Sequence, residues 1–417
     1  MFKFYLNLAM KNLWRHKRRT ILTALAIAVG IFYYIFLDSM LAGMNRDGID
    51  NIIHFETGHI QVAAALRQEK DDEEANLKNL LPGGGDLAAR LRRIPGVAGA
   101  TGRLEAAGSI INGIDELPVI TVGVIPKGDS GVFQTADYIK KGRWVRNHEA
   151  GVVLGQGIAT LMELKVGDSI VWRTRTKQLS YQAIDLTVVG IVATPNPEIN
   201  QNQIFIPLDL AQKTLETGDS VTRVYLRADT GAETDDQLQK TSQRIAQKNY
   251  QVRLKLETWR EAAADYLAYM ESERASDTIF LLLVCVISVI GVVNTILLAS
   301  LERVREIGIL KAMGMVEKDI VRLFVWEGLG LGLLGGAIGL VLGIAANLFL
   351  VNTGLDMSAM YGNMDIGFPI ANRIYGEWNW PVMLLTFLCG LLISYLASYL
   401  PARKAAKSDP VAGLRRI

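Results

Sequence analysis

Residues 20–37 read TILTALAIAVGIFYYIFL, an apolar run without a charged side chain. Three further uncharged runs occupy residues 278–301, 328–355 and 378–402. About 20 apolar residues in a helix cross the roughly 30 Å hydrocarbon core of a bilayer, because a helix satisfies its own backbone polar groups there. The runs therefore predict four transmembrane helices. A cleaved signal peptide is disfavoured for the first run, because its apolar core is long and no A-x-A cleavage site follows it.

The distribution of charge predicts the orientation of these helices. Basic residues outnumber acidic residues 16 to 5 in segments 1–19, 302–322 and 402–417 taken together. The short segment 356–377 instead has one basic residue and three acidic residues. Because basic loops remain in the cytoplasm, both termini and residues 302–322 are predicted to be cytoplasmic. Residues 42–277 then lie on the other side of the membrane.

The composition does not support a nucleic-acid-binding protein or an external domain held together by disulfides. The chain has 44 Lys and Arg against 42 Asp and Glu, so it lacks the basic excess of a nucleic-acid-binding protein. Its two cysteines, Cys285 and Cys389, both lie in predicted spans. The external region therefore has no disulfide framework and depends on its own hydrophobic core.

Strand-like and helical patterns alternate in the external region, which predicts a mixed α+β domain. We expect Asp86 to cap a short helix that ends at Pro95 and Gly96. The expected strands are 117–124, 151–154, 169–174, 184–193, 203–206, 221–227 and 250–256, and the expected helices are 156–164, 208–217 and 234–248.

Two helical stalks are expected between the membrane and this domain. Residues 43–56 extend the first span outward until Gly58, and the amphipathic residues 258–276 lead directly into the second span. A continuous helix from Thr258 to Leu301 would be about 66 Å long. The alternative is a break near Ser276 and Asp277, with the amphipathic segment packed on the domain.

The predicted fold class is a membrane protein with four transmembrane α-helices and a large extracytoplasmic α+β domain on helical stalks between the first and second spans. The predicted segments are the cytoplasmic N-terminus 1–20, span 21–41, external domain 42–277, span 278–301, cytoplasmic segment 302–322, span 323–354, hairpin 355–377, span 378–401 and cytoplasmic tail 402–417.

The cytoplasmic segment 302–322 is too apolar for a plain loop. Ile307, Leu310 and Met313 fall on one face of a short helix that Gly314 can end, and Glu317 can begin the next helix. An apolar ridge framed by charges at a membrane surface predicts docking into a groove of a partner protein. The alternative is an interfacial helix that lies on lipid.

Glycines recur at intervals of four in the third span. One series is Gly328, Gly332 and Gly336, and the other is Gly335, Gly339 and Gly343. Small residues allow helix backbones to approach closely in lipid, so these glycines predict packing against neighbouring spans. A glycine-lined substrate groove is the alternative.

Polar residues near the spans give little support for a proton-transfer, metal or catalytic site. Asp38 and Glu327 lie near the ends of their spans, which favours interfacial anchoring or polar packing over proton transfer. His54, Glu56 and His59 do not have the spacing of a two-histidine zinc motif, so no metal site is expected. No phosphate-loop motif or catalytic constellation can be identified, and nucleotide is therefore expected on another polypeptide.

Several segments resemble a known family. Residues 305–314 (REIGILKAMG) closely resemble the coupling segment of MacB/FtsX-like ABC transporter permeases, and residues 401–415 (PARKAAKSDPVAGLR) resemble their C-terminal signature. Residues 58–62 (GHIQV), 152–159 (VVLGQGIA) and 187–191 (TVVGI) are most similar to the lipoprotein-releasing LolC/LolE branch. The predicted topology agrees with that family over essentially the whole chain.

The resemblance implies a permease of the bacterial inner membrane, with its large domain in the periplasm and no enzymatic activity of its own. Its implied partners are two ABC ATPase subunits that carry ATP and Mg, a second permease protomer, identical or related, a lipoprotein substrate, a periplasmic carrier or adaptor, and membrane lipid. No cofactor, metal or nucleic acid is expected on this chain. The residues expected to couple it to the ATPase are Glu302, Arg303, Arg305, Glu306, Ile307, Leu310, Lys311, Met313 and Gly314.

A lipoprotein substrate would need an apolar surface for its acyl chains. The outer halves of the first and second spans supply candidates, including flexible Met side chains. These candidates are Phe36, Met40, Leu41, Met44, Phe280, Leu283 and Ile287, for which ordinary lipid contact is the alternative.

Two other functions fit the same family. A MacB-like permease would expel a peptide or drug from the periplasm, whereas an FtsX-like permease would activate a cell-wall hydrolase without transport. The branch motifs favour release of lipoproteins, with the ATPase pushing on residues 302–315 and stiff helices carrying the movement outward.

Overall fold

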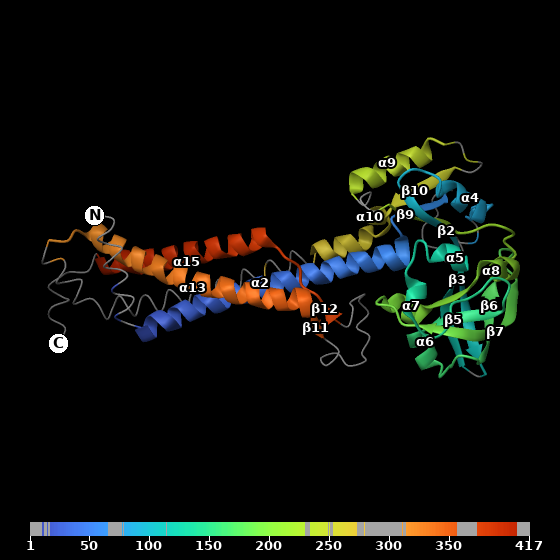
Figure 1. Cartoon of the computed structure of the whole chain (residues 1–417), viewed down its shortest axis with the longest axis horizontal. Coiled ribbons are helices and arrows are strands. Elements are labelled where there is room, and N and C mark those ends of the chain that lie inside the picture. The colour runs from blue at the N-terminus through green and yellow to red at the C-terminus, as the bar shows by residue number, and fades with distance from the viewer. Residues whose placement is uncertain are drawn as a thin grey trace. The chain divides into compact units, whose positions relative to one another are not determined.

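The computed structural model (Figure 1) describes residues 11, 15, 17–65, 77, 79–113, 115–229, 234–248, 250, 253–272, 279, 311, 314–356 and 373–406. These residues form two compact units. We call residues 46–269 the sheet unit and the described residues of 1–45, 270–356 and 373–417 the helical unit. The predicted second span, 278–301, lies outside the described residues except for Ile279.

Three long apolar helices characterise the helical unit. They are α2 (Lys17–Asn51), α13 (Glu317–Thr353) and α15 (Trp380–Ala406). Each is long and apolar enough to cross a membrane. Three of the four predicted spans therefore have a matching helix in the described part of the chain.

The outer faces of these helices are apolar. Leu25, Val29 and Tyr33 are exposed at intervals of four residues on α2, and Leu384 and Leu388 are exposed on α15. Large exposed apolar surfaces of this kind are expected where a protein contacts membrane lipid. Cys389 of α15 is also exposed and is a free thiol.

The ends of the predicted hairpin 355–377 pair with each other. Strand β11 (Leu355–Asp356) is antiparallel to β12 (Arg373–Ile374). Gly354 precedes β11 with φ of 69° and closes α13 through its N–H bond to the Leu350 carbonyl.

A ten-stranded mixed sheet forms the sheet unit. Its order is β10-β1-β9-β2-β3-β8-β5-β7-β4, and β6 pairs with β2 and β7. Most pairs are antiparallel, whereas β3–β8 and β5–β7 are parallel. The strands are β1 (Ile60–Ala64), β2 (Val97–Asn112), β3 (Asp115–Val124), β4 (Ile139–Gly142), β5 (Gly151–Gly155), β6 (Ser169–Arg175), β7 (Tyr181–Val192), β8 (Gln203–Pro207), β9 (Arg223–Ala228) and β10 (Leu254–Thr258).

Short helices precede, connect and follow these strands. They are the π-helix η1 (Ile52–Thr57), α4 (Gly84–Leu91), α5 (Pro126–Asp129), the 3-10 helix η2 (Thr135–Tyr138), α6 (Gln156–Leu161), α7 (Pro197–Asn202), α8 (Leu208–Leu215), α9 (Asp235–Ala246) and α10 (Trp259–Ala262).

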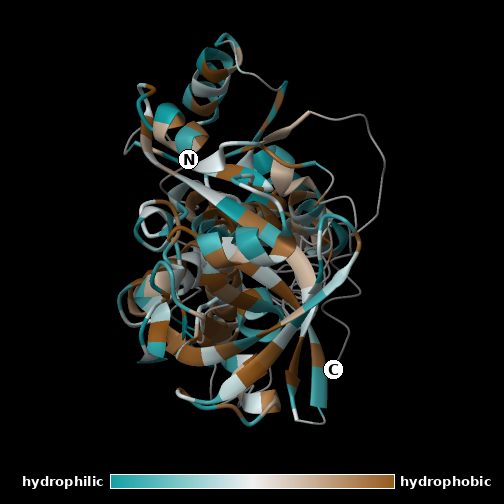
Figure 2. Ribbon diagram, turned by 90° about the vertical axis from the view of Figure 1, so that its right-hand side faces the viewer, coloured by the Kyte–Doolittle hydropathy of each residue, from teal (hydrophilic) through white to brown (hydrophobic). Residues whose placement is uncertain are grey.

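The sheet is buried on both faces at β8. Ile204 and Ile206 belong to the larger core, whereas Phe205 between them belongs to a second core with Phe55 and Val153. Adjacent residues of a strand point to opposite faces, so one strand serves both cores. Figure 2 shows hydrophobic and hydrophilic residues alternating along the strands of this unit.

The seven predicted strands are confirmed as β3 and β5 to β10, and the three predicted helices as α6, α8 and α9. The sequence patterns did not predict β1, β2 or β4. Strand β2 is rich in Gly and Ala, which have low strand propensity. Its small residues are required by close packing, because a Cβ atom at Gly108 would lie 2.7 Å from Trp172 Nε1.

Two local predictions are wrong. Asp86 does not cap α4, because Gly83 adopts φ of 64° and the helix begins two residues earlier, at Gly84. Asp86 instead lies in the first helical turn, where its charge is favourable.

The predicted helix from Thr258 to Leu301 is also not continuous. Thr258 ends β10 and begins α10 through a capping box with Glu261. Ala263 then interrupts the helix, with φ of −100° and ψ of 22°. Because Trp259 and Ala263 are buried in the sheet unit, packing determines this break although no Pro or Gly is present. Residues 264–272 are helical, and 273–278 lie outside the described residues.

Candidate functional site

Three of the six glycines in the two predicted series of α13 lie against α2. A Cβ atom at Gly335 would lie 2.6 Å from the Ala24 carbonyl oxygen, and one at Gly339 would lie 2.6 Å from the Ala28 carbonyl oxygen. One at Gly343 would lie 2.9 Å from Ile35 Cδ1. These contacts bring the two helix backbones close together in the helical unit.

The other three glycines lie against α15. A Cβ atom at Gly332 would lie 2.6 Å from Ser394 Oγ, and one at Gly328 would overlap the side chain of Ser398. Gly336 faces Phe387, at 2.9 Å by the same measure. The two glycine series therefore allow α13 to pack closely against two neighbours at once.

Hydrogen bonds within a polar cluster join α2, α13 and the segment before α15. The hydroxyl of Ser39 donates to Asn347 Oδ1 over 2.6 Å, and Asn347 Nδ2 donates to the Glu377 carbonyl over 3.4 Å. The Glu377 N–H donates to the Ser39 carbonyl over 3.1 Å. Ser39 and Asn347 are buried, so hydrogen bonding meets the polar requirements of both side chains.

The two acids near the span ends occupy different environments. Glu327 is buried within α13 and Asp38 of α2 is half-buried, and both have interaction partners. Glu327 is thus more enclosed than an interfacial anchor, which favours the expected polar packing.

Most of the expected ATPase-coupling residues lie outside the described residues. These are Glu302, Arg303, Arg305, Glu306, Ile307, Leu310 and Met313. Gly314 has φ of 93°, and its N–H donates to the Lys311 carbonyl over 2.9 Å. Helix α13 begins soon after, at Glu317 as predicted.

The expected acyl-chain residues of the first span all belong to α2. Phe36, Met40, Leu41 and Met44 are each half-buried, and the Phe36 ring stacks on Phe32 with centroids 6.0 Å apart. The candidates of the second span, Phe280, Leu283 and Ile287, lie outside the described residues.

The first helical run is longer than one crossing of a bilayer requires. A helix that enters the hydrocarbon core at Thr20 leaves it after about 20 residues, near Met40. Glu56 of η1 follows 16 residues later and belongs to the sheet unit. Gly58, with φ of 60°, ends the run as predicted.

The side chains of η1 point into different surroundings. Phe55 is buried in the second core, and its ring packs edge-on to Tyr138 with centroids 5.4 Å apart. Glu56 accepts a hydrogen bond from Asn196 Nδ2. Burial raises the pKa of Glu56 and the charge of Glu198 adds to this effect, whereas the hydrogen bond from Asn196 acts in the opposite direction.

Two cavities flank η1 within the sheet unit. One of about 360 Å³ extends toward Arg103, Glu105 and Tyr225, and one of about 400 Å³ extends toward α7 and Tyr266. Glu56, Thr57, Glu198 and Ala262 line both.

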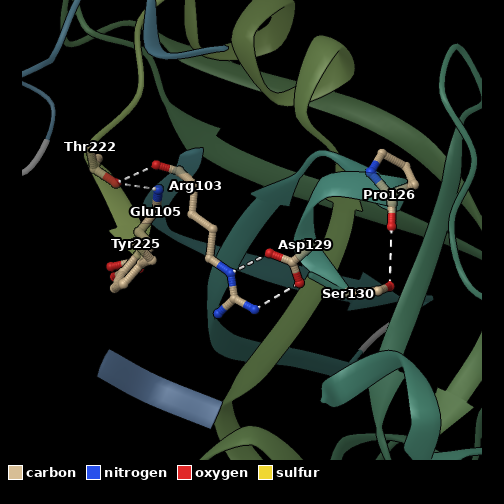
Figure 3. Close-up of polar contacts among 7 residues, drawn as sticks. All are labelled: Arg103, Glu105, Pro126, Asp129, Ser130, Thr222 and Tyr225. Atoms are coloured by element: carbon tan, nitrogen blue, oxygen red, sulfur yellow. Dashed lines mark hydrogen bonds and ion pairs between the residues drawn. The ribbon is translucent and has the colours of Figure 1, made fainter. Parts of the chain in front are cut away.

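A buried ion pair supports the wall of the first cavity (Figure 3). Arg103 of β2 donates two hydrogen bonds of 2.8 Å to Asp129 of α5. Its guanidinium also lies over the Phe133 ring, 3.4 Å from the centroid. Because both charges are buried and the pair makes two hydrogen bonds, the orientation of the Arg103 side chain is fixed.

Tyr225 of β9 completes the same wall. Its hydroxyl donates to Glu105 over 2.6 Å, and Arg223 lies 3.4 Å from the other oxygen of that carboxylate. Burial and the charge of Glu105 raise the pKa of Tyr225, so the phenol stays protonated. Sequence reasoning missed this network, because its members come from strands far apart in the chain.

No metal centre occurs among the described residues, since they contain no group of three or more His, Cys, Asp or Glu side chains suited to a metal. The His54 ring instead contacts its own helix, with Nδ1 2.8 Å from the Asp50 carbonyl.

Comparison with known proteins identifies the family. Residues 20–244 match the MacB-like periplasmic core domain, and residues 278–410 match the FtsX-like permease C-terminal domain. The first match alone covers more than half of the chain. This chain belongs to the MacB/FtsX-like family of ABC transporter permeases. Members of the family work with ABC ATPase partners, and the apolar helices agree with a permease of the bacterial inner membrane with a periplasmic domain.

Its relatives include proteins from two branches. The chain is 25% identical to the lipoprotein-releasing system transmembrane protein LolE of Haemophilus influenzae, over 78% of this chain and 79% of that protein. It is 26% identical to the macrolide export ATP-binding/permease protein MacB 2 of Aeromonas hydrophila, over 98% of this chain but 60% of that protein. The periplasmic region of MacB from Actinobacillus actinomycetemcomitans aligns over 52% of this chain and 96% of that structure, with 12% identity and a TM-score of 0.35.

Proposed function

We propose that this chain is the permease subunit of a lipoprotein-releasing ABC transporter. It takes triacylated lipoproteins from the outer leaflet of the inner membrane and passes them to a periplasmic carrier. The likeness to LolE carries the proposal, because it extends over 79% of that protein and includes both the membrane and the periplasmic segments.

The contacts of the helical unit support a mechanical role. Glycine packing and the Ser39–Asn347 bond join α2 and α13, while Ile320 and Phe324 of α13 pack against Ala402 of α15. ATP and Mg bind a separate ATPase subunit, and that subunit pushes on residues 302–315. Because the three helices share buried contacts, a push on one displaces the others.

Acyl chains of the substrate contact the outer turns of α2 in this proposal. Phe36, Met40, Leu41 and Met44 are half-buried, so each retains a surface that a lipid chain can cover. Met side chains adapt to acyl chains of different shape. A second permease protomer supplies the opposite wall.

Release of a purified lipoprotein tests this function. The permease and its ATPase are placed in proteoliposomes with a fluorescent triacylated lipoprotein, and transfer to a soluble carrier is measured with ATP. Phe36→Ala combined with Met40→Ala is expected to lower transfer about thirtyfold, because two apolar contacts of roughly 1 kcal/mol each are lost. Leu25→Ala combined with Val29→Ala is the control on the same helix and should leave transfer unchanged.

Efflux is the second candidate, because MacB 2 of Aeromonas hydrophila aligns with 98% of this chain. ATP-dependent movement of a macrolide or peptide, with no transfer of lipoprotein, would support that function. Activation of a cell-wall hydrolase without any transported molecule would instead support an FtsX-like role. Either result would reject lipoprotein release.

A further inference from the structure

The π-helix η1 is an unusual way for the first helical run to end. In a π-helix each N–H bonds to the carbonyl five residues back, whereas an α-helix uses the carbonyl four residues back. The six residues of η1, IIHFET, contain no Pro or Gly and can form an α-helix. Tertiary contacts must therefore hold this segment in the π form.

Asn196 makes a hydrogen bond to η1 in which its side chain must be the donor. Its Oδ1 atom accepts the backbone N–H groups of Glu198 and Ile199 at the start of α7, over 2.9 and 3.4 Å. Its Nδ2 atom is then left to donate, and it donates to Glu56 of η1. Because Asn196 is 1% exposed and caps α7, its amide cannot turn over without losing that cap.

Two further hydrogen bonds accompany the π turn. The Thr57 hydroxyl donates to the Ile52 carbonyl five residues back, over 3.2 Å. The Gln134 N–H donates to the His54 carbonyl over 3.2 Å. Both bonds satisfy carbonyl groups of η1 from outside the α-helical pattern.

The surroundings of η1 leave room for movement. The cavity of about 400 Å³ is lined by Ile52, Glu56 and Thr57 on one side and by Ala263 and Tyr266 on the other. A helix turn can move toward this space, but the movement must also release Phe55 from the second core.

We infer that η1 is a hinge that exchanges between the π and α forms, and that the hydrogen bond from Asn196 to Glu56 is the latch that holds the π form. The α form moves the pattern by one residue, which turns the exit at Gly58 by about 100° around the helix axis. Strand β1 follows Gly58 and pairs with both β10 and β9, so the turn reaches the sheet. The latch is a property of the sheet unit, whereas the use of the hinge in transport rests on the proposed function.

Backbone hydrogen exchange of the full chain in nanodiscs, without ATPase or substrate, tests the latch. Asn196→Asp keeps the side-chain oxygen that caps α7. It replaces the amide donor with a carboxylate oxygen, which then faces the carboxylate of Glu56. Exchange at residues 52–57 is expected to rise at least tenfold, while residues 199–202 of α7 stay within about twofold of the unaltered protein. Glu198→Gln changes the charge of the same cavity without removing the latch, and it should leave exchange at η1 unchanged.

A reversed pair makes the test specific. In the double variant Asn196→Asp with Glu56→Gln, the new amide donates to the new carboxylate, so the hydrogen bond returns with its direction reversed. Exchange at η1 is expected to return to within about twofold of the unaltered protein. Unchanged exchange in Asn196→Asp, or fast exchange in the double variant, would overturn the latch.

Removal of one residue tests the hinge itself. Deletion of His54 takes the extra residue from the π turn, so η1 should exchange as slowly as the last turns of α2. ATP-driven release by this variant is expected to fall at least tenfold while ATPase binding is retained. Normal release would overturn the hinge and leave the proposed function intact. Absence of release by the unaltered protein would instead reject the proposed function, and the exchange data would still decide the latch.

Discussion

Ser39 and Asn347 are 308 residues apart in the sequence, yet the hydroxyl of Ser39 donates to Asn347 Oδ1 over 2.6 Å inside the helical unit. Gly376 packs beside this bond, because a Cβ atom there would lie 3.2 Å from Asn347 Oδ1. The contact joins α2 to α13. On α2 it lies between Phe36 and Met40, two residues of the proposed acyl-chain surface.

Loss of this bond should weaken the packing of α2 on α13. Asn347→Ala is expected to lower the unfolding free energy by about 1 kcal/mol, the usual size of a hydrogen bond between membrane helices. Unfolding in bicelles measures the change. Asn352→Ala is the control, because Asn352 is exposed on the same helix and bonds to the carbonyl of Leu348 in its own helix. Equal losses in the two variants would contradict the role of the Ser39 contact.

A larger residue at Gly339 should separate the same two helices. Its Cβ atom would lie 2.6 Å from the Ala28 carbonyl oxygen and 3.0 Å from Ile31 Cβ. Gly339→Leu is therefore expected to destabilise the helical unit by roughly 1–3 kcal/mol or more, as overpacking does elsewhere. Bicelle unfolding is again the measurement, and Leu342→Ala, at an exposed position, should have little effect. A stable Gly339→Leu protein would show that the contact can open without cost.

The ion pair between Arg103 and Asp129 should matter more to the sheet unit than any surface pair. Asp129→Asn leaves a buried guanidinium without its carboxylate and is expected to cost about 3–5 kcal/mol. Arg173→Met breaks the half-exposed pair with Glu116 and should cost at most about 1 kcal/mol. Chemical denaturation of the purified chain, followed by tryptophan fluorescence, compares the two. Similar midpoints for both variants would refute the difference.

The pH dependence of stability should include Glu149. The hydrogen bond from Arg143 holds the pKa of Glu149 below its usual value of 4.5. The folded state therefore binds the proton less readily, and this contribution is present above the usual pKa and is lost as pH falls through the lowered one. Glu149→Gln should lower Tm at pH 7, and its difference from the unaltered protein should shrink below about pH 4. A difference that does not depend on pH would exclude this carboxylate.

Docking of the ATPase should depend on the apolar face of residues 302–314. Leu310→Asp places a charge on that face and is expected to abolish copurification with the ATPase while membrane insertion stays normal. Lys318→Ala is a nearby control on the first turn of α13 and should bind normally. Unchanged copurification of Leu310→Asp would contradict the coupling assignment.

Sequence patterns predicted the elements that depend on local composition. The spans of α2, α13 and α15 follow from runs of apolar residues, and β3, β5 and β8 follow from short apolar segments between turns. Strand β2 could not be found in this way. Its Gly and Ala residues have no strand signal of their own, and tertiary neighbours, such as Trp172 beside Gly108 and the Gly131 carbonyl beside Gly99, require the glycines.

The candidate site was predicted in part. The two glycine series indicated close helix packing, but their spacing did not reveal that Gly335 faces α2 while Gly332 faces α15. Asn196 had a local signal as a capping residue before Pro197. Its second contact, with Glu56, spans 140 residues and left no trace in the pattern of either segment.

The sequence by itself determined which segments are apolar enough for a membrane and, through the positions of Lys and Arg, which side each loop prefers, because both properties add up over neighbouring residues. Tertiary structure decided the π form of η1, the break at Ala263 and the partner of each glycine. Those features depend on hydrogen bonds and close contacts between residues far apart in the chain, and such contacts can override the helical preference of the local sequence.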